Sequence, residues 1–310
     1  MKQLICGTTA YSTFSNDAAS GRLSHAYMLH LNDVSNLRAV LKIFALRFYG
    51  LDENSVDGKR ITSEIFTDCR IYPAEGKKLT ADAVAELLGE SAMRPVEGDK
   101  KLFIISGFEQ ASALLQNKLL KTLEEPPQGV YFLLGVCSLA PVLDTVKSRV
   151  KTLTIPPFSE EEILSALERK SKNAMNAEAA KSCGGVLGVA ENMVSGSWFA
   201  EIRSAAREIC TTTKLGDAGA VAVKYGEIKR KEELLSSLAV LYHEALCERA
   251  RGGQLGEVAR LWQTPALTYA LESVDKAVAD VKFNAFFQGP LYDFMLRIIE
   301  ENNKWLKLQA

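Results

Sequence analysis

Short apolar runs, separated by stretches of helical periodicity, fill the first half of the chain. Four runs rich in apolar, aromatic or β-branched residues predict strands at 26–31, 65–72, 102–106 and 130–136, and a fifth short strand is expected at KTLTI, after Val150. Two of the runs, LFIIS and VYFLLGV, are continuously apolar. That pattern is typical of parallel strands covered by helices on both faces.

Helical patterns lie between these runs. Residues 36–49 carry apolar side chains at spacings of three and four, and residues 80–88 repeat the pattern behind Thr80, a candidate N-cap. Strand and helix therefore alternate up to about residue 155. This alternation predicts one α/β domain with a doubly wound parallel sheet.

The pattern changes after Pro156 and Pro157. Ser159 followed by Glu162 is a capping box, with acidic residues in the first helical turn where the helix dipole favours them. From there to residue 310 the periodicity is almost entirely helical, with apolar stripes at 234–245, 267–281 and 291–299. These stripes predict the core of a helical bundle, so the fold class is α/β followed by all-α.

Composition indicates the general class of protein but no particular activity. The 310 residues suffice for two or three domains, and 47% hydrophobic with 24% charged residues fits an ordinary globular protein. No membrane span and no signal peptide are recognisable, so a cytoplasmic protein is expected. The formal net charge of -1 argues against tight nucleic-acid binding by the chain alone. Four local basic clusters, at 59–60, 77–78, 100–101 and 229–231, are expected to be solvated faces or, gathered by folding, to line a channel.

The six cysteines, at positions 6, 69, 137, 183, 210 and 247, are scattered along the chain. Their spacing provides neither a zinc knuckle nor a disulfide framework. We expect buried or inert thiols and no bound metal.

The segment QNKLLKTLEEPP, between the strands LFIIS and VYFLLGV, is the most specific motif. Pro126 disfavours helix at Glu125, so a helix must stop there. The segment resembles the clamp-loader branch of the AAA+ proteins, in which such a helix is followed by a strand and then by a Ser-Arg-Cys motif. The matching residues are Asn117, Leu119, Leu120, Lys121, Leu123, Glu124, Glu125, Pro126 and Pro127.

The resemblance covers nearly the whole chain, strongly from 100 to 160 and weakly beyond 200. GRLSHAY at 21–27 is similar to the segment before the family's phosphate loop, 184–193 is similar to its sensor 2 helix, and Asn284 is similar to an asparagine of its C-terminal collar. The resemblance implies three domains: an AAA+-like α/β domain at 1–155, a helical lid at 156–205 and a helical collar for oligomerisation at 206–310.

The segment that aligns with the phosphate loop lacks what a phosphate site needs. Such a loop uses glycines for close backbone approach, a lysine for the β- and γ-phosphates and a hydroxyl for magnesium. No glycine is present, Leu37 stands at the lysine position, and Asp33 would bring negative charge towards a polyphosphate. The degenerate loop positions are Leu31, Val34, Asn36, Leu37 and Arg38.

Two further losses fall on the same predicted pocket. The strand that should end in Walker B carboxylates runs into Ser106 and Gly107, and Val189 stands at the position of the sensor 2 arginine. We therefore expect no nucleotide cofactor and no metal, and a chain that is not an enzyme by itself. A misaligned loop with a working site elsewhere is the alternative, although no other GxxxxGK[ST] exists in the chain.

Ser148 and Arg149 are retained, with Val150 in place of the family's cysteine. The resemblance implies that Arg149 reaches the ATP site of a neighbouring subunit, where its planar, permanently charged guanidinium suits a reacting γ-phosphate. A surface ion pair is the alternative for Arg149. Many relatives carry a four-cysteine zinc module after the first helix, but Cys69 alone occurs between residues 50 and 100 here.

The expected function is that of a non-hydrolysing, stator-type subunit of a pentameric clamp loader, which helps to place a sliding clamp on primed DNA. The implied partners are the ATPase subunits, the delta subunit, the sliding clamp and primed DNA, with no membrane. Two alternatives stay open: an ATP-hydrolysing motor subunit of the same family, or an AAA+-derived adaptor for protein contacts.

Overall fold

The computed structural model describes residues 1–196, 198–252, 254–281 and 287–309, so Asn284 lies outside the described residues. The chain divides into two compact units. Unit 1 comprises Met1–Lys172 with Cys183–Glu191, and unit 2 comprises Asn173–Ser182 with Asn192–Ala310. The domain boundaries expected near 155 and 205 stay a prediction.

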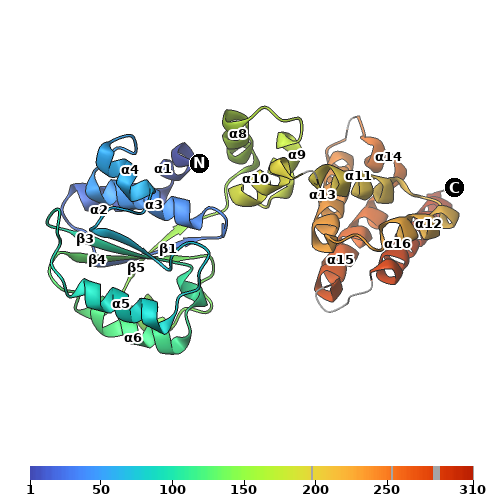
Figure 1. Ribbon diagram of the computed structural model, residues 1–310. Helices are drawn as coiled ribbons and strands as arrows, with labels where there is room; N and C mark the ends of the chain where they lie inside the picture. Colours follow the sequence, from blue (N-terminus) through green and yellow to red (C-terminus); the bar gives the residue numbers. More distant parts are fainter. Residues whose placement is uncertain (197, 253, 282–286, 310) are drawn as a thin grey trace. The chain divides into compact units, whose positions relative to one another are not determined.

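Unit 1 is built on a five-stranded sheet with the order β2-β3-β4-β1-β5, in which all neighbours are parallel (Figure 1). The strands are β1 (Ala26–Leu31), β2 (Cys69–Tyr72), β3 (Lys101–Ser106), β4 (Val130–Val136) and β5 (Lys151–Ile155). The strands expected at 26–31 and 130–136 are confirmed residue for residue. The strand expected at 65–72 begins only at Cys69, because the Ile65 amide donates to Arg60 O and closes the preceding helix.

Helices cover both faces of this sheet (Figure 1). One face carries α1 (Lys2–Cys6), α2 (Thr9–Ala19), α3 (Leu37–Tyr49) and α4 (Val56–Thr62). The other carries α5 (Ala81–Ser91), the 3₁₀ turn η1 (Phe108–Gln110), α6 (Ala113–Glu124) and α7 (Asp144–Lys147). Tyr27 and Leu29 of β1 face the first group while Ala26 and Met28 face the second, which explains the unbroken apolar runs. The doubly wound parallel sheet is confirmed.

The helix boundaries follow from local chemistry. The Thr80 hydroxyl accepts the Ala83 amide at 3.2 Å and caps α5. Ser159 and Glu162 form the expected capping box at the start of α8 (Glu160–Lys170). Helix α6 ends at Glu124, and Glu125 before Pro126 has a non-helical φ of -129°.

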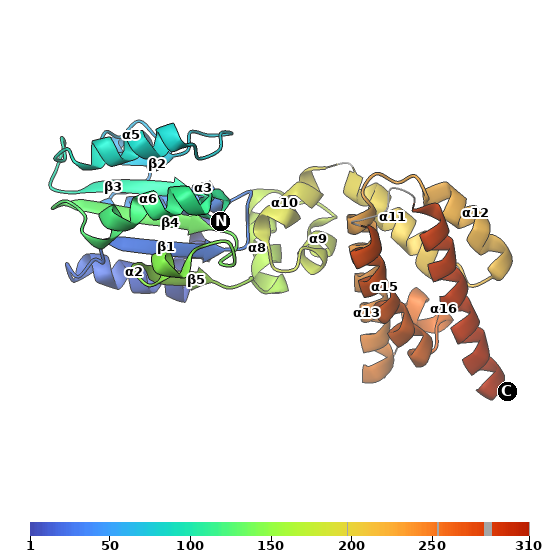
Figure 2. The same ribbon diagram turned by 90° about the horizontal axis from the view of Figure 1, so that it is seen from below.

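Beyond residue 155 the described part of the chain contains helices and no strand, as expected. They are α8, α9 (Asn176–Ser182), α10 (Leu187–Ser195), α11 (Trp198–Thr211), α12 (Leu215–Tyr225), α13 (Lys231–Arg251), α14 (Glu257–Leu261), α15 (Thr264–Val281) and α16 (Gln288–Gln309). Figure 2 gives a second view of them. Of these, α8 and the first half of α10 belong to unit 1.

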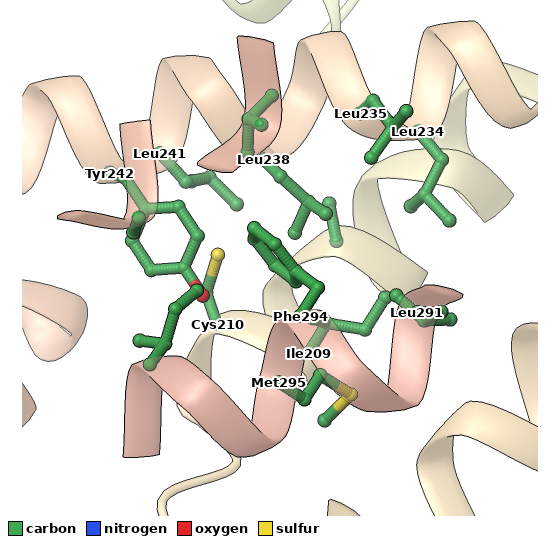
Figure 3. Packing of buried hydrophobic residues seen from close by; sticks show 14 of the residues in the cluster. Ile209, Cys210, Leu234, Leu235, Leu238, Leu241, Tyr242, Leu291, Phe294 and Met295 are labelled. Atoms are coloured by element: carbon green, nitrogen blue, oxygen red, sulfur yellow. The ribbon is translucent and has the colours of Figure 1, made fainter. Parts of the chain in front are cut away.

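The core of unit 2 lies between long helices. Figure 3 shows Ile209 of α11, Leu238 of α13 and Phe294 of α16 meeting in this core. The indole N–H of buried Trp262 donates to Cys210 O at 2.6 Å, so the largest core side chain has its polar atom satisfied. Among the described helices none is long and apolar enough to cross a membrane.

Candidate functional site

The segment at residues 31–38 joins the carboxyl end of β1 to the start of α3, which is where a phosphate loop lies in a parallel α/β sheet. Leu37, the first residue of α3, is only 3% exposed. A Cβ atom on Gly135 of β4 would lie 3.2 Å from Leu37 Cδ1 and 2.6 Å from Leu41 Cδ1, so α3 packs very closely on the sheet here. The residue that aligns with the phosphate-binding lysine is therefore part of the hydrophobic core.

Arg38, the next residue, carries a positive charge that is already paired within the chain. Its Nε and Nη2 atoms donate to the two carboxylate oxygens of Glu64 at 2.7 and 2.5 Å, and Nη1 donates to Pro73 O at 2.9 Å. Lys42 pairs with the same carboxylate at 2.8 Å. These partners, Arg38 first, hold the pKa of Glu64 below its usual value.

Asp33 is buried in the same segment, at 4% exposure. Its Oδ1 accepts the Asn36 amide at 3.1 Å, and its Oδ2 accepts Asn36 Nδ2 at 3.0 Å and the Gly188 amide of α10 at 2.8 Å. Val189, next to Gly188, is 40% exposed. A carboxylate thus occupies the loop where a phosphate site would present amides and a lysine.

A cavity of about 300 Å³ lies beyond the carboxyl ends of β3 and β4. Ser106, Gly107 and Cys137 line it together with Leu37 and Arg38. Burial, followed by the charge of Glu109, raises the pKa of Cys137 to about 11, so this thiol is protonated at neutral pH.

Glu109 also lines the cavity, and one of its carboxylate oxygens is buried without a hydrogen-bond partner. A magnesium-bound triphosphate requires cationic and amide donors. Lys77 and Gln110 line this cavity beside Glu109, and the guanidinium of Arg38 there is already bound to Glu64. Across the described residues no cluster of three or more His, Cys, Asp or Glu is arranged to hold a metal ion.

Ser148 and Arg149 follow α7 on the other side of unit 1. Arg149 Nη1 donates to Thr145 O at 2.8 Å, and Nη2 pairs with Glu124 Oε1 of α6 at 3.0 Å. The Arg149 side chain is 31% exposed and that of Glu124 is 55% exposed. The guanidinium is therefore oriented by two helices of its own fold, α6 and α7, yet still reaches solvent.

Helix α6 also holds the segment that leads to Arg149. Gln116 is 1% exposed, its amide nitrogen donates to Ala111 O at 3.0 Å and Pro141 O at 3.1 Å, and its carbonyl oxygen accepts the Leu143 amide at 2.9 Å. Leu143 is the N-cap of α7. The motif on α6 thus supports α7 through Gln116 and Arg149 through Glu124.

Several residues of the basic clusters are paired or buried within their own unit. Arg60 pairs with Glu97 and Asp57, and Arg230 pairs with Glu233. Lys101 is 5% exposed and donates to Glu90 O at 3.1 Å. These contacts leave both interpretations of the clusters, solvated faces or the lining of a channel, as predictions.

The structure therefore groups the sequence-predicted residues into three places. One cavity is lined by Val34, Leu37, Arg38, Ser106 and Gly107. Asp33 and Asn36 contact α10. Ser148 and Arg149 follow α7, where Arg149 pairs with Glu124 of α6. Sequence reasoning missed the roles of Glu124 and Gln116 as supports and the Asp33 contact to Gly188. Glu124 lies within the recognised motif, which was the available signal for its importance.

The match to a known protein family lies in the part of the chain that contains the parallel sheet. Residues 7–159 match the family described as "DNA polymerase III, delta subunit". The delta' subunit of DNA polymerase III from Bacillus subtilis is 30% identical over 154 residues, 48% of this chain and 47% of that protein. A gamma subunit of DNA polymerase III from Buchnera aphidicola (Acyrthosiphon pisum) is 28% identical over 170 residues, 51% of this chain and 45% of that protein.

The chain thus spans about half the length of these curated relatives. A solved gamma-subunit-related protein from Thermotoga maritima superposes with a TM-score of 0.44 at 13% identity, covering 93% of this chain and 98% of that one. The matched segment, residues 7–159, is just under half of the 310-residue chain, and it is similar to the family described as "DNA polymerase III, delta subunit" and to delta' and gamma subunits of DNA polymerase III.

Proposed function

We propose that this chain is a non-hydrolysing, stator-type subunit of the DNA polymerase III clamp loader, of the delta-prime kind. In this proposal it binds no ATP and donates Arg149, with Ser148, to the ATP site of a neighbouring subunit. It would help its partners to load the sliding clamp on primed DNA.

One contrast within unit 1 carries the proposal. At the phosphate-loop segment, Leu37 is a core residue, Arg38 is bound to Glu64, and Asp33 adds a buried carboxylate. At the end of α7, Arg149 keeps solvent access and a supported orientation. A domain that had lost both features would serve no ATP chemistry, and one that had kept both would be an ATPase.

The trans role of Arg149 is supported by the chemistry of its side chain. A guanidinium stays charged at all physiological pH values and offers a planar fork of donors to phosphate oxygens. Its pairing with Glu124 is partly exposed, so solvent screening keeps this ion pair weak. A γ-phosphate can compete for it.

The remaining parts of the proposal concern assembly. The helical segments at 156–205 and 206–310 are assigned as lid and collar, and the collar would join the ATPase subunits and the delta subunit. The sliding clamp and primed DNA would be met within that assembly, in the cytoplasm. These partners are inferred from the relatives, which are named as subunits of DNA polymerase III.

Arg149→Ala in a loader reconstituted with its ATPase subunits tests the trans role. Clamp-stimulated and DNA-stimulated ATP hydrolysis at the adjoining site should fall by about 10³-fold or more, because an arginine finger stabilises charge in the transition state by that amount. Assembly, followed by gel filtration, should be unchanged. Lys147→Ala removes a nearby cation that pairs with Asp144 and serves as the matched control. Equal rates for wild type and Arg149→Ala would eliminate the assigned role.

The motor-subunit alternative has one observation in its favour, the similarity of gamma subunits over the same half of the chain. Titration calorimetry of the isolated chain with ATP and magnesium separates the two functions. The stator proposal expects no binding at millimolar nucleotide, because the phosphate-loop segment has Leu37 at the lysine position and adds the buried carboxylate of Asp33. Micromolar binding would establish the motor function instead.

A further inference from the structure

The amino end of α10 is held by a residue that is 155 positions earlier in the chain. The Gly188 amide, in the first turn of the helix, donates to Asp33 Oδ2 at 2.8 Å in a buried contact. First-turn amides of a helix have no partner within the helix, and the helix dipole makes this end attractive to anions. Asp33 supplies both the acceptor and the negative charge.

The Asp33 carboxylate is also held by hydrogen bonds within the phosphate-loop segment. It accepts the backbone amide of Asn36 at 3.1 Å and the Asn36 side-chain amide at 3.0 Å. Three donors thus surround one buried carboxylate, two from its own loop and one from α10. Hydrogen bonds to an ionised acceptor are stronger than neutral ones, which offsets the cost of burying the charge.

Gly188 makes the close approach possible. A Cβ atom at this position would lie 2.3 Å from Asp33 Oδ1, 2.8 Å from Ser35 Cβ and 3.0 Å from Asn36 Nδ2. These distances leave no space for any side chain. The backbone of Gly188 is not in the left-handed region, so its conformation does not require glycine. The close contact with Asp33 does.

A second set of contacts runs through the same residues. Asn36 Nδ2 also lies 3.3 Å from Glu191 Oε2 of α10, and Glu191 Oε1 pairs with Lys170, the last residue of α8, at 3.1 Å. Asp33 and Asn36 are therefore connected to both helical segments that belong to unit 1.

We propose that Asp33 is an internal anion that fastens the amino end of α10 to the phosphate-loop segment without any nucleotide. Helix amino ends near phosphate loops are general sites for phosphate groups. In this chain a carboxylate supplied by the loop satisfies the helix instead. The segment 183–191 is then fixed on the α/β domain at all times. This inference goes beyond the proposed function and needs no partner subunit.

Hydrogen exchange of the full chain, followed by mass spectrometry, tests it. Asp33→Ala should speed amide exchange at 187–191 by roughly 10- to 100-fold, the equivalent of a lost hydrogen bond to a charged group. Asp57→Ala removes a half-exposed aspartate on α4 and should leave those residues unchanged. Millimolar magnesium-ATP should not slow exchange at 187–191 in the wild type or rescue the Asp33→Ala variant.

A second pair of variants keeps the inference testable if Asp33→Ala fails to fold. Gly188→Ala should speed exchange at 187–191, whereas Gly89→Ala in α5, where a Cβ meets nothing within 4 Å, should not. Unchanged exchange at 187–191 in folded Asp33→Ala or Gly188→Ala would overturn the fastening role. If ATP slowed exchange at 187–191 in the wild type, the chain would bind nucleotide, and both this inference and the stator proposal would be wrong. If Asp33→Ala left exchange unchanged, only the fastening role of Asp33 would be wrong, and the stator proposal would stand.

Discussion

At the scale of single residues, side chains of similar chemistry differ in how deeply they are buried and in how many partners they have. Gln116 and Glu124 both lie on α6 and both support the α7 end, but Gln116 is fully buried with three hydrogen bonds and Glu124 is half exposed with one ion pair. The sequence predicted that Arg149 and Asp33 mattered. It could not predict their partners, because contacts across 25 and 155 residues leave no periodic signal.

Loss of Gln116 should lower the free energy of unfolding more than loss of Glu124. Gln116→Ala leaves the Ala111 carbonyl, which is in a buried hydrogen bond, and the part-buried bonds of the Pro141 carbonyl and the Leu143 amide without this side chain, so the free energy of unfolding should fall by about 2 to 3 kcal/mol. Glu124→Gln breaks a screened pair and should cost less than about 1 kcal/mol. Urea denaturation of unit 1 measures both. Equal losses for the two variants would contradict the assignment of Gln116 as the main support.

At the scale of elements, most boundaries were predictable where one local rule dominated. Pro126 ends α6, Thr80 and Ser159 begin α5 and α8, and the apolar runs became β3 and β4. The helices α1, α2, α4 and α7 were not predicted. Three of the four have seven residues or fewer, too short for a clear periodic pattern, and packing on the sheet stabilises them instead.

The strand predicted from residue 65 shows how a tertiary constraint overrides propensity. Glu64 adopts a left-handed conformation, with φ of 62°, and its carboxylate is held by Arg38 and Lys42. Asp68, just before β2, accepts the amides of Val96 and Glu97. These long-range bonds keep 65–68 out of the sheet although its residues favour a strand.

At the scale of the whole molecule, each unit has its own buried core and its own acid-sensitive pairs. In unit 1, Lys151 holds the pKa of Asp17 below its usual value, and Arg38 does the same for Glu64. In unit 2, Lys224 lowers the pKa of Glu208. Each of these carboxylates is more stable ionised in the folded chain than in the unfolded one.

Acid should therefore weaken both units. A carboxylate whose pKa is lowered by folding stabilises the fold above its unfolded pKa, near 3.8 for Asp and 4.5 for Glu, and loses that contribution as the pH falls through the folded value. The free energy of unfolding, measured with urea between pH 7 and pH 3, should stay level and then decline below about pH 4.5. Glu64→Gln should flatten the decline for unit 1. A rise in stability on acidification would refute this.

The Asp33 contact has a consequence for the history of the chain. Restoring a lysine at position 37 and glycines between residues 31 and 36 would still leave a carboxylate facing the α10 amide, and replacing Asp33 first would leave that amide buried and unpaired. On the proposed function, a route from this loop to a nucleotide-binding one that replaces Asp33 first would therefore pass through a less stable protein. Selection acting on one substitution at a time would not favour that route.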